Sequence, residues 1–402
     1  MKKVWLLGFG FFSISLTWAL YNAFVPLFLD DYLKSTAAIG FLMTVDNYFA
    51  LFIQPWIGNL SDRTDTPFGK RMPYLLIGMP LSAVFFSLIP FRTSLATLIL
   101  FMVLMNLSMS LYRSPTVALM PDITHEARRS QANGIINFMG GIGSVLAFGV
   151  GSFLYKIGPP VPFITASLAT ILSLVIVASV IKEKRDAIAY PPAGASAPVR
   201  FRGELDRTTV CLLGAIFFWF VAYQGIEALF TLYGTHYLGM SDSAASFSLL
   251  FFSGSFLLFT LPSGWLGARF GKKPVITAGV IGLGACFAIM IFIDATVWLR
   301  LFLVLGGLFW ACININSYPF VVSIGRAESI GTRTGLYYLV SAVAAILSPP
   351  LLGQFVDWFG YSVLFIYTSL GMLAALVFIL LVPNRGLAAG TPPTLSEEKR
   401  GA

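Results

Sequence analysis

Charged residues are scarce in this sequence. Only 11% of its 402 residues are Asp, Glu, Lys or Arg, whereas soluble domains carry roughly 25%. Hydrophobic residues make up 57%, and the mean hydropathy is +0.82. The net charge of +8 would suit nucleic acid, but the cations fall in short loops between apolar runs. The composition therefore excludes an ordinary soluble protein, and we expect a membrane protein with no nucleic-acid partner.

Cysteine and histidine are also rare. Cys211, Cys286 and Cys312 all lie within apolar runs, which excludes a disulfide framework. His125 and His236 are too few and too far apart for a metal cluster, so we expect no metal and no cofactor. The sequence has neither an H-E-x-x-H nor a G-x-S-x-G pattern, and we therefore expect that it is not an enzyme. No A-x-A cleavage signal follows the first apolar run, which we interpret as a membrane span.

Long apolar segments dominate the rest of the chain. A helix needs about 20 mostly apolar residues to cross the hydrocarbon core of a bilayer. Twelve segments meet this requirement: 4–29, 36–58, 73–91, 95–118, 131–155, 160–181, 208–233, 243–264, 274–293, 297–324, 333–355 and 361–382. The sequence therefore predicts an all-α membrane protein with twelve transmembrane helices.

The basic residues predict how these helices are oriented. All but four of the 26 lysines and arginines fall on the side of the chain termini, the exceptions being Lys34, Arg92, Lys156 and Arg300. Because cytoplasmic loops are enriched in Lys and Arg, both termini are predicted to be cytoplasmic. The predicted organisation is a six-helix half, a cytoplasmic linker, a second six-helix half and a cytoplasmic tail, at residues 1–181, 182–207, 208–382 and 383–402.

The loop after the second span has a counterpart in the second half. Gly58-Asn59-Leu60-Ser61-Asp62-Arg63 precedes Phe68-Gly69-Lys70-Arg71, and Gly264-Trp265-Leu266-Gly267-Ala268-Arg269 precedes Phe270-Gly271-Lys272-Lys273. The two copies begin 206 residues apart, at Gly58 and Gly264, which is half the chain. Parallel repeats with a central site are typical of transporters. The alternative is that two unrelated loops are both basic because they face the cytoplasm.

These loops resemble the G-x-x-x-D-R-x-G-R-[RK] motif of the major facilitator superfamily. In the first copy, four residues separate Asp62-Arg63 from Phe68-Gly69-Lys70-Arg71-Met72-Pro73-Tyr74, which is similar to the D-R-x4-F-G-R-R-x-P-[FY] stretch of sucrose transporters. The insertion has the length found in melibiose-type glycoside–cation symporters. Gln54-Pro55-Trp56-Ile57-Gly58 is similar to Q-P-L-V-G, and Ser114–Asp122 resembles G-P-x-x-A-L-L-A-D at the end of helix 4. The resemblance implies the major facilitator fold and sugar–cation symport.

The sequence departs from both branches at the positions that couple transport to an ion. The sucrose branch has an Asp in helix 4 and an Arg eleven residues later, and these positions hold Asn106 and Val117 here. The sodium-binding aspartates of the melibiose branch are replaced by Ala50 and Gln54, and its helix-4 aspartate by Arg113. The sugar and the coupling cation therefore do not follow from the resemblance.

Two acids at membrane depth are candidates for proton coupling. Asp46 follows the start of its span by ten residues, about 15 Å, and Glu227 lies in the seventh span. Burial in a membrane disfavours a charged carboxylate, and protonation relieves this cost. We therefore predict that Asp46 and Glu227 carry protons. The alternatives are a structural acid held by hydrogen bonds for Asp46 and a hydrated acid at the rim for Glu227.

Candidate substrate-binding residues surround these acids in the sequence. Arg113 could hold a carboxylate or sugar hydroxyls, or could instead extend to the cytoplasmic interface. Amides donate and accept hydrogen bonds, and aromatic rings stack on sugars. The predicted set is Arg113, Asn22, Tyr21, Trp18, Gln224, Tyr223, Asn314 and Asn137. Asn133, Asn316 and Trp310 are further possibilities, although interhelical hydrogen bonding is the expected role of most membrane amides.

The repeated loops predict a cytoplasmic gate. A charge network that is buried when the cytoplasmic side is closed and broken when it opens provides the two-state element that alternating access needs. The predicted gate residues are Asp62, Arg63, Gly69, Lys70, Arg71, Asp122 and Arg269. Gly143, Ala147 and Gly151 recur every four residues and predict close helix packing without a chemical role.

The leading hypothesis from the sequence is a proton-coupled symporter of a sugar or glycoside. It would be a multi-pass monomer in the cell membrane, and its partners would be the small-molecule substrate, the proton and the lipid bilayer. The alternatives are an exporter of an amphipathic metabolite or drug, which would have a less polar cavity with fewer amides, and a uniporter. An intramembrane enzyme or a receptor is a further alternative, but the sequence has no catalytic pattern, and a receptor should not repeat its gating loop in both halves.

Overall fold

The computed structural model describes residues 2–125, 128–183, 206–324 and 330–383. The first group of helices is α1 (Lys2–Asp30), α2 (Thr36–Met43), α3 (Val45–Arg63), α4 (Met72–Leu88), η1 (Ile89–Phe91), α5 (Leu95–Asp122), α6 (Arg129–Leu146), η3 (Ala147–Gly151), α7 (Ser152–Ile157) and α8 (Pro160–Val180). The second group is α9 (Arg207–His236), α10 (Asp242–Phe270), α11 (Lys272–Met290), α12 (Thr296–Ser323), α13 (Ile330–Phe359) and α14 (Val363–Leu381).

Within the described residues, twelve helical stretches are long and apolar enough to cross a membrane, as the sequence predicts. The second span comprises α2 and α3, and the fifth comprises α6, η3 and α7. Two helices extend past their predicted ends at 58 and 264, to Arg63 and Phe270. They do so because a helix continues into water after its apolar stretch ends. Most of the predicted linker (182–207) and tail (383–402) lies outside the described residues.

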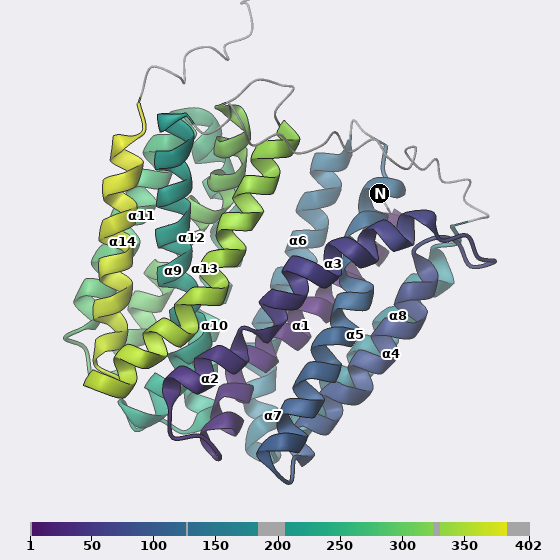
Figure 1. Cartoon of the computed structure of the whole chain (residues 1–402), viewed down its shortest axis with the longest axis horizontal. Helices are drawn as coiled ribbons and strands as arrows, with labels where there is room; N and C mark the ends of the chain where they lie inside the picture. Colours follow the sequence, from purple (N-terminus) through teal and green to yellow (C-terminus); the bar gives the residue numbers. More distant parts are fainter. Residues whose placement is uncertain (1, 126–127, 184–205, 325–329, 384–402) are drawn as a thin grey trace, which may run out of the picture.

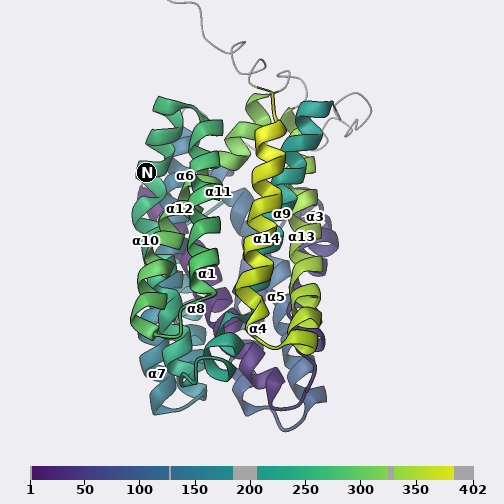
Figure 2. The same ribbon diagram turned by 90° about the vertical axis from the view of Figure 1, so that its left-hand side faces the viewer.

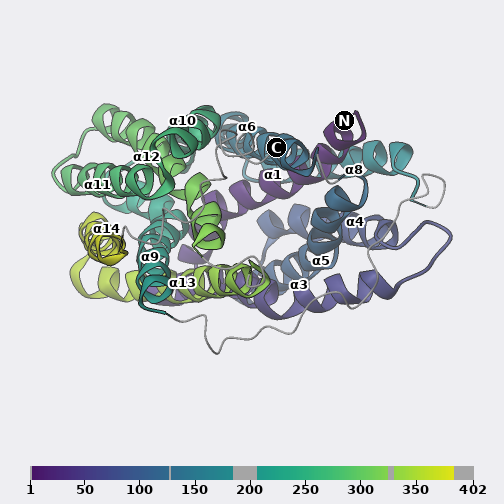
Figure 3. The ribbon, with the colours of Figure 1, turned by 90° about the horizontal axis from the view of Figure 1, so that it is seen from above.

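The two groups of helices repeat one packing pattern. In the first group, α1 packs on α6 and α8, α4 packs on α5 and α8, and α3 packs on α5. In the second group, α9 packs on α13 and α14, α11 packs on α12 and α14, and α10 packs on α12. Each pair in one group has its counterpart in the other. Seen from above in Figure 3, the two bundles lie side by side.

Among the residues that the structure describes, the hydrogen bonds between the bundles lie at one end and in the middle of the molecule. Asp357 at the end of α13 accepts from the Thr36 and Ala37 amides at 2.6 and 3.1 Å, and these amides begin α2. Ser243 of α10 donates to the Ser152 carbonyl of α7. In Figures 1 and 2 this end is at the bottom, and in Figure 1 the bundles diverge toward the top. We call the bottom the closed end. The other end carries Asp62, Lys70 and Lys272, and we call it the basic end.

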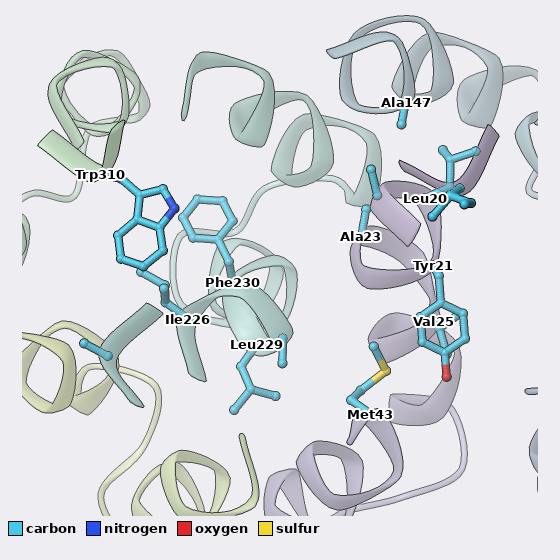
Figure 4. Close-up of a cluster of buried hydrophobic side chains, with 14 of the residues drawn as sticks. Leu20, Tyr21, Ala23, Val25, Met43, Ala147, Ile226, Leu229, Phe230 and Trp310 are labelled. Atoms are coloured by element: carbon cyan, nitrogen blue, oxygen red, sulfur yellow. The ribbon is translucent and has the colours of Figure 1, made fainter. Parts of the chain in front are cut away.

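Small residues allow two pairs of helices to approach closely, α6 with α1 and α2 with α13. A Cβ added at Gly143 of α6 would come within 2.5 Å of the Phe12 carbonyl oxygen, which confirms the predicted packing role of this glycine. A Cβ at Gly40 would overlap the Pro349 carbonyl where α2 crosses α13. Figure 4 shows buried side chains of α1, with Leu20 on the side of Ala147 of η3, and of α9, with Ile226, Leu229 and Phe230.

Candidate functional site

Asp46 lies beside a break in the second span. Thr44 interrupts the helix between α2 and α3, and its hydroxyl donates to the Phe41 carbonyl at 2.8 Å. Asp46 is therefore in the first turn of α3 and near the middle of the span. Its Oδ1 accepts a hydrogen bond from Asn47 Nδ2 at 3.2 Å, and its side chain is half-buried. A half-buried carboxyl group therefore stands at an interrupted helix.

Glu227 lies on α9 and faces the other bundle. Asn22 of α1 donates through Nδ2 to Glu227 Oε1 at 3.5 Å, and Tyr223 is hydrogen-bonded to the same carboxyl group. Asp46 is close enough for its charge to act on Glu227. The two acids predicted to carry protons therefore belong to one central site, with Asp46 from the first bundle and Glu227 from the second.

Arg113 of α5 lies on the Asp46 side of this site. Its charge acts on Asp46, and its Cζ atom lies 6.0 Å from the centre of the Trp18 ring. The predicted alternative, a side chain that extends to the basic end, does not fit this contact with Trp18 on α1. Arg113 is half-buried, as are Trp18 and Asn22.

Aromatic rings line the Glu227 side. Tyr223 stacks on Trp310 of α12 with ring centres 4.1 Å apart and planes inclined by 7°. Phe252 of α10 lies 6.0 Å from Tyr223, and Phe220 meets Trp310 edge-on. The central site therefore combines a charged side from the first bundle with an aromatic side from the second.

The asparagines that the sequence predicts as candidate substrate residues have different surroundings in the structure. Asn316 is buried and donates to Ser263 and to the Cys312 carbonyl, so it bonds helices together. Asn137 is exposed, and it donates to the side chain of Asn133 at 3.1 Å. Asn314 is half-buried, one turn along α12 from Trp310.

Two other predicted substrate residues lie on α1 and α9. Gln224 is half-buried beside Tyr223. Tyr21 is fully buried, and its hydroxyl accepts from Asn106 Nδ2 at 3.3 Å. Tyr21 therefore supports the site from behind instead of lining it.

At the basic end, Arg71 is the centre of a buried charge network. Its guanidinium pairs with Asp62 of α3 and, at 3.2 Å, with Asp122 of α5. It also donates to Ser61 and to the Gly58 carbonyl. Arg71 is only 6% exposed, so these acceptors replace water around a buried cation. Three of the predicted gate residues, Asp62, Arg71 and Asp122, are thus brought together within the first bundle.

The other predicted gate residues have different surroundings. Gly69 has a φ of +111°, and Lys70 donates through Nζ to the Asp62 carbonyl at 3.3 Å. Arg63 is exposed. Arg269 lies over the rings of Trp265 and Phe270 in the second bundle, and no ion pair of Arg269 occurs within the described residues. Arg269 therefore lies outside the Arg71 network, because the second loop copy belongs to the other bundle, and its part in the gate stays a prediction.

Sequence reasoning missed Glu183, which follows α8. Its carboxylate accepts from the backbone amides of Lys70 and Met72, both at 2.6 Å, and from that of Arg71. These amides lie at the start of α4, where a helix attracts anions. A Cβ at Gly69 would overlap Glu183, so this turn needs glycine for both its φ and its space. In the sequence, Glu183 is a single acid at the end of a span, which gives no sign of this role.

Contacts at the closed end were missed as well. His236 of α9 is 2.6 Å from the Asp30 carboxylate of α1, and Tyr155 donates to Asp242 of α10 at 3.1 Å. Asp30 and His236 are 206 residues apart, which is the spacing of the repeated loops. Equivalent positions of the two halves thus meet across the interface.

A two-bundle membrane fold with a central polar site and a repeated charged loop defines a polytopic transporter. The sequence pattern of the Major Facilitator Superfamily matches residues 7–257 and 235–400. The chain belongs to this superfamily, and it is a multi-pass membrane transporter of that type.

Relatives and solved structures support this assignment. The chain is 23% identical over 338 residues to the class B tetracycline resistance protein of Escherichia coli, covering 81% of this chain and 82% of the relative. It is 21% identical over 238 residues to the quinolone resistance protein NorA of Staphylococcus aureus, covering 59% of this chain and 60% of NorA. The crystal structure of the nucleoside transporter NupG has a TM-score of 0.70 at 16% identity, covering 95% of this chain and 99% of that structure. An inward-facing, occupied bacterial homologue of the lysosomal transporter Spinster has a TM-score of 0.69 at 16% identity, covering 94% of this chain and 93% of that structure.

Proposed function

We propose that this chain is a proton-coupled secondary transporter that moves a small organic molecule by alternating access. The observation that carries the proposal is the meeting of Asn22 and Glu227 between the bundles, within the electrostatic reach of Asp46. A carboxyl group at this interface changes its surroundings when the bundles move. Protonation removes most of the cost of burying it, so proton binding and bundle movement are linked.

The structure corresponds to the state that opens toward the basic end. The closed end is held by Asp357 on α2 and by Ser243 on α7. If the basic end faces the cytoplasm, as the distribution of lysine and arginine predicts, this state is open to the inside. In this state the Arg71 network is intact within the first bundle, so the predicted separation of these charges when the basic end opens does not occur here. The part of Arg71 in closing that end stays a prediction.

Sugar or glycoside symport stays our interpretation of the sequence motifs, and export is a second candidate. The specific observation that favours export is the small number of amides at the central site. Asn316 bonds its neighbours and Asn137 bonds Asn133, so of the predicted substrate amides Asn22 and Gln224 lie near the acids, beside Asn47, which bonds Asp46. Tyr223, which is half-buried and backed by the buried Trp310, gives the site an aromatic side. The resemblance to tetracycline and quinolone resistance proteins agrees with an amphipathic substrate.

A ligand screen by thermal unfolding of the purified protein separates these substrate classes. A ligand present at 100 times its dissociation constant stabilises a protein by about 2.7 kcal/mol. Stabilisation by sugars or glycosides alone supports symport, and stabilisation by tetracycline or a quinolone supports export. A ligand whose effect survives unchanged in both Asp46→Asn and Glu227→Gln, at every pH, contradicts a proton-linked central site.

A further inference from the structure

Arg113 differs from the other buried arginine of the first bundle. Arg71 has two carboxylates and two oxygen acceptors around it. Arg113, in the part of the chain that the structure describes, has no carboxylate within 4 Å and no hydrogen bond, although the charge of Asp46 acts on it. Its contact is the face of Trp18 at 6.0 Å. An unpaired guanidinium at membrane depth is costly, so its five donors call for an acceptor.

A second unused donor belongs to Trp18. Its Nε1 atom is buried and has no hydrogen-bond partner among the described residues. Buried N–H groups are normally paired, and one that is not needs an explanation. Trp18 is also the residue over which Arg113 lies. The charged side of the central site therefore presents donors without acceptors from two helices, α1 and α5.

The opposite side of the site differs in chemistry. Tyr223 and Trp310 form a parallel stack, and Phe252 extends it. Trp310 is only 3% exposed and is covered by Tyr223, so the half-buried rings of Tyr223 and Phe252 are the apolar groups that a ring could contact, edge to face or offset. A ligand that matches both sides would carry an anionic group at one end and an apolar or ring-shaped body at the other.

We propose that the substrate is a ring-bearing organic monocarboxylate whose carboxylate binds Arg113 when Asp46 is protonated. This inference rests on the proposed function and adds the substrate class. The planar guanidinium can donate two parallel hydrogen bonds to a carboxylate. A carboxylate ligand is therefore favoured over a ligand that offers a single neutral oxygen. The ring lies toward Tyr223 and Phe252.

Charge balance links the proton to the substrate. While Asp46 is ionised, it and the substrate carboxylate compete for one cation. A proton on Asp46 removes the competing anion, so proton and substrate enter the site together with no net charge. The other titratable groups that act on Asp46 or feel its charge are Glu227 on α9 and Tyr21 on α1, and the Tyr21 hydroxyl is bonded to Asn106. Neither one supplies a second cation.

The test uses acids and their neutral amides as matched probes. Benzoate, 4-hydroxyphenylacetate and glucuronate are compared with benzamide, 4-hydroxyphenylacetamide and glucuronamide in thermal unfolding of the purified full-length protein at pH 5.5 and 8. We expect at least one acid to raise the Tm, more at pH 5.5 than at pH 8, while its amide does not. Arg113→Gln should weaken the apparent affinity for that acid by roughly 10- to 100-fold, the loss expected for hydrogen bonds to a charged group.

Two variants keep the test decisive if Arg113→Gln does not fold. Asp46→Asn retains Arg113, and it should make binding of the acid independent of pH. Lys34→Gln, which removes an exposed cation in the loop before α2, should leave binding unchanged. The inference is overturned if none of the three acids raises the Tm, if an amide binds as well as its acid, or if binding strengthens from pH 5.5 to 8. Proton-driven transport of a neutral substrate would overturn this inference and leave the proposed function standing.

Discussion

Asn22 and Glu227 stand 205 residues apart and meet across the interface between the bundles, with Asn22 Nδ2 3.5 Å from Glu227 Oε1. The repeated loops have almost the same spacing, 206 residues, and so do Asp30 and His236. α1 and α9 therefore face each other with equivalent residues. At an offset of 206 the counterpart of Asn22 is Ala228 and that of Glu227 is Tyr21, so the amide and the acid lie one residue out of register at the point where we place proton binding.

The orientation of the chain can be tested with reporter fusions. We expect fusions after Lys184 and at Ala402 both to report the cytoplasm, because nearly all lysines and arginines lie on that side. Alkaline phosphatase and green fluorescent protein give opposite signals on the two sides of the membrane and serve as mutual controls. An external location at either site would contradict the predicted orientation.

Asp62 tests the role of the basic end in gating. Its carboxylate pairs with Arg71 and is half-exposed, so Asp62→Asn removes one charge of the network without creating a cavity. We expect transport to fall while substrate binding remains, because the balance between the two open states changes. The measurements are transport in proteoliposomes and ligand-induced thermal stabilisation in detergent. Equal loss of binding and transport would show that Asp62 does not act through gating.

Arg71 tests the stability of the same network. Arg71→Met leaves the buried Asp122 carboxylate without its cation, which should cost about 3 to 5 kcal/mol in the free energy of unfolding. Arg63→Met is the matched control, because Arg63 is exposed in the same region and its loss should change stability by less than about 0.5 kcal/mol. Thermal unfolding of both variants provides the comparison. Similar effects of the two substitutions would contradict the buried network.

Asp357 tests the closed end. Its carboxylate accepts from Ser35 Oγ and from the Thr36 and Ala37 amides, and so it holds the start of α2 against α13. We expect Asp357→Asn to shift the protein toward the state that opens at this end, because a neutral amide is a weaker acceptor for the start of a helix. Asp294→Asn removes an exposed acid outside these contacts and should have no such effect.

The shift can be followed by the distance between spin labels placed on α2 and α13 at the closed end. The three native cysteines are buried, which limits background labelling. An unchanged distance distribution in Asp357→Asn, or an equal change in Asp294→Asn, would contradict the assignment.

Sequence reasoning predicts the spans well because the bilayer fixes their length. It also predicts that Asp62, Arg71 and Asp122 act together, because their motif constrains three nearby helix ends. The partner of Asn22 could not be predicted, because it depends on how α1 packs on α9. Glu183 was missed for a similar reason, since it lies 113 residues from Lys70 in the sequence. Asn316 and Asn137 have the same side chain as Asn22, and only packing separates their roles.

The central claim is that Asp46 and Glu227 couple transport to the proton. Ala50 and Gln54 leave no cluster of oxygen ligands for a metal cation in the second span, so we expect transport to be indifferent to sodium. The most direct test is substrate uptake into proteoliposomes under imposed proton and sodium gradients, using a ligand identified by thermal unfolding. The account predicts accumulation driven by protons alone, which Asp46→Asn or Glu227→Gln abolishes while exchange without a gradient continues. Stimulation by sodium, or full proton-driven accumulation in both variants, would contradict it.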